Sequence, residues 1–391
     1  MFVFQIFSEG TSFGLIWAIM AIGVYITYRI LDIADLGVEG TFPLGACIVA
    51  LLISIGVPAI LATIIATIFG ALFGILTGVL HTKLKIPAIL SGIITMTALY
   101  TINMIILGKF QGTETTLAID AEKTIFSATT NFLFANNDKL FLIVLGFVLF
   151  LSLAFIGLIL FGFIKSIIKV GYKANLKSNI VKTILLSILS IIALAVVVIL
   201  FLWLIKVIDL TEFNKFLKKY TDVLSLCFIS GIILAIVFAI CYWFFGTEIG
   251  MSLRATGNNK QMSKAQGINT DIMIILGLAI SNALVALSGA VYAQDLGNAN
   301  MDLGTGIIVI GLATIVVGES IFGRQDFKKS LISVIVGAII YFILDTTAVK
   351  LHVENYLKLV RAALIVFVLV VPQIKKFVQN KKKRVGGLNN A

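Results

Sequence analysis

Long apolar segments, separated by short polar ones, recur along the whole chain. Most are close to the roughly 20 residues that an α-helix needs to cross the hydrocarbon core of a bilayer. Helices satisfy their own backbone amides and carbonyls inside the membrane, and the period-2 alternation of a membrane barrel is missing from this sequence. We therefore predict an all-α polytopic integral membrane protein with about 11 transmembrane helices. The expected spans are residues 12–30, 41–57, 59–80, 87–108, 139–164, 183–207, 223–245, 271–293, 304–322, 331–349 and 356–372.

The composition excludes a soluble globular protein. Hydrophobic residues make up 60% and charged residues 13% of the chain, and the mean hydropathy is +1.10. The net charge of +11 does not indicate a nucleic-acid partner, because the basic residues are spread over the loops between spans. Cys47, Cys227 and Cys241 all lie in apolar segments, where they fit packing better than a disulfide framework or a metal site.

The distribution of basic residues predicts the topology. With the N-terminus outside, the inside loops carry twice as many Lys and Arg residues as the outside loops. The positive-inside rule then places the C-terminus in the cytoplasm. On this reading residues 1–372 form the transmembrane domain, and residues 373–391 form a basic cytoplasmic tail next to the membrane lipid.

A polar segment between two apolar spans, Thr247 to Asp271, is the most informative part of the chain. It predicts a short helix with Asn258 or Asn259 as N-cap and Gly267 as the left-handed residue at its C-terminal end. An ordinary charged loop is the plainer reading. The sharper hypothesis is a docking element for a soluble partner.

Two polar interruptions break the regular pattern of spans. Residues 29–45 and 294–311 each combine acidic residues with the glycine-rich start of an apolar helix. With the N-terminus outside, the first interruption faces inward and the second faces outward. Similar units in opposite orientations suggest inverted repeats with interrupted helices, although simple interfacial loops would give a similar pattern.

Small and polar residues within the spans are candidates for packing and for the solute pathway. Glycines spaced four apart allow two helices to approach closely, and such a ridge is formed by Gly70, Gly74 and Gly78. Polar groups in apolar helices are candidates for the pathway, although they more often bond to their own or a neighbouring helix. These candidates are Thr41, Ser91, Thr95, Ser281, Asn282 and Ser288.

Catalytic and nucleotide-binding signatures are missing from the sequence. There is no G-x-x-x-x-G-K-[ST] motif, and the two histidines, His81 and His352, fall near span ends. Acidic residues in or beside spans indicate function by default, and for Glu319 a pairing role or a role at a helix end is favoured over ion coupling. The acids in question are Asp32, Asp35, Glu39, Glu319 and Asp345.

The polar segment resembles the cytoplasmic loop of permeases in ABC importers of the ribose and branched-chain amino-acid type. Residues 28–46, YRILDIADLGVEGTFPLGA, are similar to a second signature of that family, with Asp32 where many members have Asn. Residues 277–294 and 304–323 resemble a third. The segments ADLGVEGTFPLGA and VVGESIFG are most similar in sequence to a subgroup linked to the uptake of amino acids, including aromatic ones. The loop matches at Thr247, Gly250, Leu253, Ala255, Gly257, Asn258, Ala265, Gly267 and Ile268.

The resemblance implies a transport machine with several subunits in a bacterial cytoplasmic membrane. Two permease copies, expected to be a homodimer, form the pathway, and an external solute-binding protein delivers the solute. Cytoplasmic ATPases hold the ATP and Mg²⁺, so this chain needs no cofactor and is not an enzyme. The residues expected to couple to the ATPase are Arg254, Ala255, Gly257, Asn258, Asn259, Lys260, Ala265, Gly267 and Ile268.

The resemblance covers roughly residues 11–110 and 240–372, and it leaves residues 113–239 as a longer stretch that would include an inserted helical hairpin. Two alternatives stay open. An ion-coupled secondary transporter would work without an ATPase and would depend on Glu319 or Asp345. A scaffolding membrane protein would need neither paired helix interruptions nor a capped polar helix.

Overall fold

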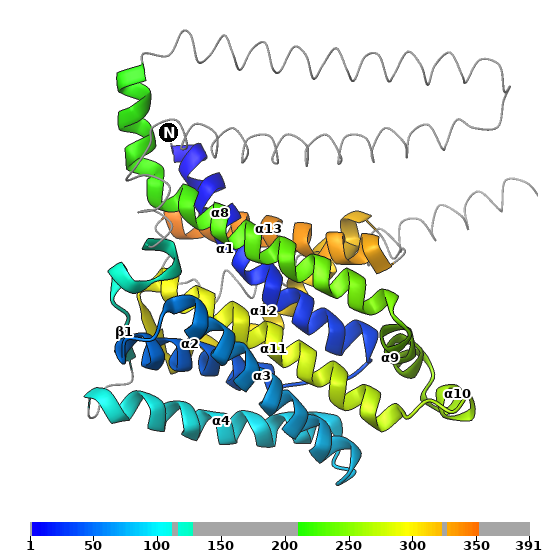
Figure 1. The fold of residues 1–391 in the computed structure, drawn as a ribbon. Coiled ribbons are helices and arrows are strands. Elements are labelled where there is room, and N and C mark those ends of the chain that lie inside the picture. Colours follow the sequence, from blue (N-terminus) through cyan, green and yellow to red (C-terminus); the bar gives the residue numbers. More distant parts are fainter. Residues whose placement is uncertain (1, 112–115, 128–209, 323–326, 352–391) are drawn as a thin grey trace, which may run out of the picture. The chain divides into compact units, whose positions relative to one another are not determined.

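Helices dominate the computed structural model, which describes residues 2–111, 116–127, 210–322 and 327–351 (Figure 1). The chain forms two compact units, residues 1–129 with 225–391 and residues 130–224. The first contains nearly all described residues, and all contacts below lie within it. Its elements are α1 (Phe2–Tyr25), the π-helix η1 (Ile26–Ile30), α2 (Val38–Ser54), α3 (Ala59–Thr82), α4 (Ala88–Gln111), β1 (Thr116–Ala118), the 3₁₀-helix η2 (Ala121–Lys123), α8 (Leu210–Gly246, whose first residues belong to the second unit), α9 (Glu248–Asn258), α10 (Lys260–Ala265), α11 (Thr270–Leu296), β2 (Asn298–Asn300), the 3₁₀-helix η3 (Met301–Gly304), α12 (Ile307–Phe322) and α13 (Phe327–Lys350).

The described helices confirm the predicted class, an all-α polytopic membrane protein. Seven of them are long and apolar enough to cross a membrane, and α2 is a shorter apolar helix. Each predicted span within the described residues corresponds to one of these helices. The expected spans 139–164, 183–207 and 356–372, the inserted hairpin and the basic tail lie outside the described residues, so the total of about 11 stays a prediction.

The short helix α2 lies at the centre and is buried along most of its length. It packs against α11, α3 and α4, while α1 packs against α11, α12 and α13. Glycines permit the close contact of α2 with α11: a Cβ at Gly45 would lie 2.1 Å from the carbonyl oxygen of Ala286, and one at Gly289 would lie 2.1 Å from that of Phe42. With no side chain between the backbones, the two helices approach as small residues allow in membrane proteins.

The predicted glycine ridge of α3 also faces α11. A Cβ at Gly74 would lie 2.4 Å from the carbonyl oxygen of Leu278, and one at Gly78 would lie 2.8 Å from the Cα of Ile275. At Gly70 the nearest atom would be the Cβ of Ala286, at 2.4 Å. In this chain the ridge is therefore an internal helix–helix contact.

Two non-helical segments, which correspond to the two interruptions in the sequence, meet at the start of α2. Residues 31–37 lead from η1, which lies near the start of α11, to α2, and residues 297–306 lead from the end of α11 to α12. Left-handed residues turn the second segment, Gly297 at φ 71° and Gly306 at φ 76°. A Cβ at Gly304 would lie 2.1 Å from the carbonyl oxygen of Glu39, so the second interruption touches the start of α2 directly. Whether the two halves are inverted repeats stays a prediction.

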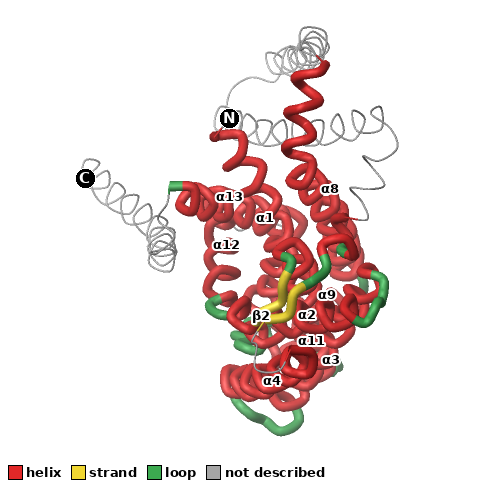
Figure 2. The backbone as a smooth tube through the Cα atoms, turned by 90° about the vertical axis from the view of Figure 1, so that its left-hand side faces the viewer, coloured by secondary structure: helices red, strands yellow, loops and turns green. Residues whose placement is uncertain are grey.

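A two-stranded antiparallel sheet lies at the end of the bundle where α11 finishes (Figure 2). Leu117 of β1 pairs with Ala299 of β2. Gln294 of α11 joins the segment after β1 to α3. Its Oε1 accepts the Ile125 amide at 3.1 Å, and its Nε2 donates to Thr63 Oγ1 at 2.9 Å. Figure 1 shows this end of the bundle at the left and α9 and α10 at the opposite end, at the right.

Candidate functional site

The polar segment forms two short helices, α9 and α10, where the sequence predicted one. Thr247 begins α9 by accepting the Gly250 amide at 3.3 Å. Asn259 ends α9 and caps α10 by accepting the Met262 amide at 3.0 Å. Gly267 then has φ 83°, so the left-handed residue expected from the sequence follows α10. The Thr247–Glu248 pair was the missed signal of the first helix, since a Thr N-cap followed by an acid is typical of a helix start.

Helix α10 exposes most of its side chains. Lys260, Lys264 and Ala265 are exposed, and so is 58% of Met262. Only Ser263 of this helix is buried. A six-residue helix with so little core of its own is held by its caps and by the Lys260–Asp271 ion pair at 3.8 Å. It therefore presents a small surface with basic and apolar groups, fixed in place by both its ends.

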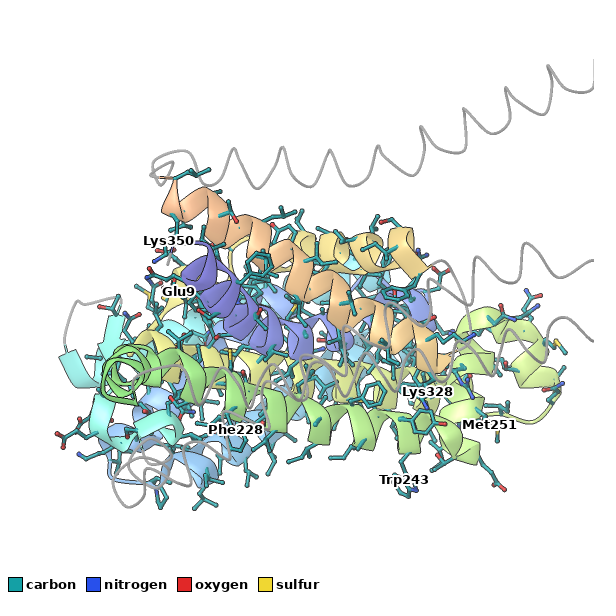
Figure 3. All side chains as sticks on the ribbon, turned by 90° about the horizontal axis from the view of Figure 1, so that it is seen from above. Glu9, Phe228, Trp243, Met251, Lys328 and Lys350 are labelled. Carbon is teal, nitrogen blue, oxygen red and sulfur yellow. The ribbon has the colours of Figure 1, made fainter. Side chains whose placement is uncertain are left out.

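Arg254 is different from the lysines of α10, because it lies against the helix bundle. Its Nη2 donates to the carbonyl oxygen of Phe245 at 3.0 Å, and its guanidinium lies 5.3 Å from the ring centroid of Phe327. Arg254 therefore joins α9 to α8 and α13, and Lys260 and Lys264 are the basic groups at the tip. Figure 3 shows Met251, Trp243 and Lys328 near this end and the ion-paired Glu9 and Lys350 near the other.

Helix α9 touches the end of the first span through its backbone. A Cβ at Gly257 would lie only 1.8 Å from the carbonyl oxygen of Ile30, the last residue of η1. A cavity of about 410 Å³ opens beside this contact and is lined by Tyr25, Arg29 and Arg254, among others. Arg29 also pairs with Glu319 of α12, its Nε lying 2.8 Å from Oε1. The structure therefore shows Glu319 in the pairing role that the sequence favoured, with Arg29 as its partner.

A polar network lies where α2 meets α11. The buried Asp35 carboxylate accepts the Asn282 side-chain amide at 2.8 Å and the Gly37 backbone amide at 2.8 Å. The other side of the Asn282 amide, Oδ1, accepts the hydroxyl of Thr41 at 2.7 Å. The interruption before α2 is thereby fixed to the middle of α11.

The other pathway candidates bond to backbone carbonyls or to neighbouring helices. Ser281 Oγ donates to Gly23 at 2.7 Å and Ser288 Oγ to Ile16 at 2.9 Å, so both join α11 to α1. Thr95 is reached by the hydroxyl of Thr77 at 2.8 Å, and Ser91 bonds within α4. All six candidates are buried within the protomer, and their assignment to the pathway stays a prediction.

One acid beside the network was not among those candidates. The Glu39 carboxylate lies near the backbone amides of Gly306 and Ile308, at the start of α12. Its neighbours Gly40 and Thr41 are buried, but Glu39 is partly exposed. A charged residue directly before a glycine-rich helix start was the signal for it.

These features define a multi-pass membrane protein with a centre of interrupted helices and a two-helix polar loop at one end. The family model described as "Branched-chain amino acid transport system / permease component" matches residues 6–369. The chain belongs to this family, and it is the permease component of an ABC-type transport system. The family resemblance drawn from the sequence is confirmed, and the matched range runs through residues 113–239, which that resemblance had set aside.

Two curated permeases illustrate the relationship. A tyrosine transport system permease protein of Clostridioides difficile is 31% identical over 353 residues, which is 90% of this chain and 86% of that protein. The ribose import permease protein RbsC of Haemophilus influenzae is 26% identical over 140 residues, 35% of this chain and 42% of that protein. No solved structure matches the chain.

Proposed function

We propose that this chain is the permease subunit of an ABC importer for an amino acid, and that α9 and α10 form its seat for a cytoplasmic ATPase. The observation that carries the proposal is the pair of capped short helices, with α10 exposed and α9 in backbone contact with η1 at Gly257 and Ile30. A membrane protein gains little stability from such an exposed element. A partner that binds this element can, however, move the helices that the element contacts.

The contacts give a route for that movement. Closure of the ATPase on ATP would push α10, and α9 would press on η1 because no side chain separates Gly257 from Ile30. The segment after η1 contains Asp35, which is bonded to Asn282 in the middle of α11. Motion at the loop would therefore tilt helices at the centre, as expected when packed elements have two discrete arrangements.

The remaining subunits follow from the type of transport system. ATP and Mg²⁺ would be bound by the ATPase, a binding protein would deliver the solute on the side of β1 and β2, and a second copy of this chain would complete the pathway. We place the N-terminus outside and the C-terminus in the cytoplasm of a bacterial cell. Tyrosine is the first solute to test, since the permease of Clostridioides difficile named above, 31% identical to this chain, serves tyrosine transport.

The docking surface can be tested with a bulky side chain at an exposed position. Ala265→Trp is expected to leave the fold intact, because Ala265 is exposed, and to abolish both co-purification with the ATPase and ATP-driven uptake. Ala121→Trp is the matched control, an exposed alanine in η2, next to the sheet at the other end of the bundle. Retention of a bound, coupled ATPase by Ala265→Trp would show that α10 is not the seat.

A further inference from the structure

The cavity beside the contact of α9 with η1 is formed by three elements. Arg254 belongs to α9, Asp32 follows η1, and Ser330 belongs to α13, and all three residues line the cavity. Figure 3 shows Lys328, near the start of α13, at the same end of the bundle as Met251 of α9. The volume of about 410 Å³ falls within the range of clefts that hold small molecules.

Arg254 brings to this cavity a positive charge that no carboxylate offsets in the described part of the chain. Its Nη2 bonds to a backbone carbonyl, that of Phe245, and its guanidinium lies against the ring of Phe327. Its Nε is buried and has no hydrogen-bond partner among the described residues, whereas buried donors normally have one. The second arginine of the cavity, Arg29, is already paired with Glu319. Arg254 is therefore the cation that remains for a ligand.

Asp32 supplies the opposite charge. Its backbone lies in the left-handed region at φ 56°, a conformation that is uncommon for residues with a side chain and is often found at ligand sites. The amides on either side of it bond to the carbonyls of Ile26 and Thr27 at 3.0 and 2.9 Å, which holds the backbone in place. Its exposed side chain pairs with no residue that the structure describes, Arg254 included. The cavity thus contains a cation and an anion that do not neutralise each other.

The rest of the lining adds ring surface and polar groups. Tyr25, Tyr28 and Phe327 contribute aromatic rings, and Asn258 contributes a side-chain amide. A zwitterion matches such a site, because its carboxylate can bond to the guanidinium and its ammonium group to the carboxylate of Asp32. A simple anion would be repelled by Asp32, and a simple cation by Arg254. The cavity therefore favours an α-amino acid, and its rings favour one with an aromatic side chain.

We propose that this cavity is a regulatory site for a free aromatic α-amino acid of the cytoplasm, whose carboxylate binds Arg254 and whose ammonium group binds Asp32. The inference rests on the proposed function, which places this end of the bundle in the cytoplasm and makes such an amino acid the product of transport. The bound ligand joins α9 to the segment after η1, beside the contact of Gly257 with Ile30. It stabilises the arrangement to which it binds, and it thereby slows a transport cycle that needs these elements to move.

Binding is measured on the purified full-length chain in detergent, with labelled tyrosine as the probe. Saturable binding is expected, and Asp32→Asn should weaken it about tenfold, as loss of a charge-assisted hydrogen bond implies. Asparagine also adopts left-handed backbone conformations, so this variant preserves the local fold. Asp302→Asn is the matched control, an exposed acid of η3 at the other end of the bundle, and should bind as the wild type does. Absence of saturable binding, or equal binding by Asp32→Asn, would overturn the site.

Two analogues of tyrosine test which residue binds which charge. N-Acetyltyrosine lacks the ammonium group and tyramine lacks the carboxylate, so each should compete about tenfold more weakly than tyrosine. Asp32→Asn should abolish the preference for tyrosine over N-acetyltyrosine, and Arg254→Met should abolish the preference over tyramine. A merely structural role of either residue would leave these preferences unchanged and would overturn the assignment. Competition by inorganic phosphate as strong as that by tyrosine would show a simple anion site instead.

The regulatory effect is measured in the assembled transporter, as ATP hydrolysis stimulated by the loaded binding protein. Tyrosine on the side of α9 and α10, at about ten times its dissociation constant, should lower the wild-type rate about tenfold, because it binds only the resting arrangement. Asp32→Asn should keep most of its rate under the same conditions. Unchanged hydrolysis in the wild type would refute the regulation. Absence of ATP-driven uptake by the wild-type complex would instead refute the proposed function, since binding to the isolated chain is measured separately.

Discussion

Replacement of Gly74 by alanine tests the contact between α3 and α11. The added Cβ would lie 2.4 Å from the carbonyl oxygen of Leu278, whereas carbon and oxygen atoms in contact between backbones are normally about 3.3 Å apart. The two helices would have to separate by about 1 Å, and a gap of that size forfeits up to about half of the dispersion energy of each atom pair across it. The Leu278 carbonyl is backbone, so it cannot move aside as a flexible side chain would.

The magnitude follows from comparison with a glycine in open surroundings. No atom lies within 4 Å of a Cβ built at Gly231 of α8. Alanine favours a helix over glycine by about 1 kcal/mol, and this gain is common to both sites. The difference between Gly74→Ala and Gly231→Ala therefore isolates the packing cost, which we expect to be about 1–3 kcal/mol.

Thermal unfolding of the purified protein in detergent, followed by the loss of the monodisperse species, measures this difference. At roughly 2 °C per kcal/mol for a chain of this size, Gly74→Ala should melt about 2–6 °C below Gly231→Ala. Gly78→Ala should behave similarly, since its Cβ would lie 2.8 Å from the Cα of Ile275. Equal melting temperatures for the three variants would refute the close approach of α3 and α11.

Three further changes test the centre and the coupling end. Asn282→Ala should destabilise the protein by about 2 kcal/mol in the same melting assay, because it removes a hydrogen bond to the buried Asp35 carboxylate. Adding Asp35→Ala should restore part of the lost stability, and a further loss would argue against the pairing of the two residues. Glu319→Ala should cost about 1.5–3 kcal/mol by leaving Arg29 unpaired, and a double-mutant cycle with Arg29→Ala should give a clear coupling energy, whereas additive losses would show no interaction. Gly257→Ala should keep the ATPase bound but uncouple ATP hydrolysis from uptake, because its Cβ would displace η1, and unchanged coupling would exclude this contact from the route.

The sequence was sufficient for the class of protein because hydropathy reports directly on the bilayer. It was less exact about helix ends. Helix α8 begins at Leu210, although the apolar span was expected from 223, and α1 begins at Phe2, although its span was expected from 12. Hydropathy marks the part of a helix that suits lipid, while hydrogen bonding continues the helix into polar residues.

Contacts between distant residues explain the rest of the difference. Asn282 and Thr41 are both polar residues in apolar helices, and only the fold reveals that they bond to each other and to Asp35. Glu39 was visible in the sequence as an acid beside a span. Its distinction from Asp35 depends on which neighbour covers each carboxylate, and a linear pattern carries no such information.

The source of energy for transport tests the central claim most directly. The chain is reconstituted in vesicles alone, and separately with its ATPase and binding protein, and accumulation of labelled tyrosine is followed under ATP or under an imposed sodium or proton gradient. The account predicts uphill accumulation only for the complete assembly supplied with ATP, with no effect of either gradient. Uphill accumulation by the chain alone, driven by a gradient, would contradict it.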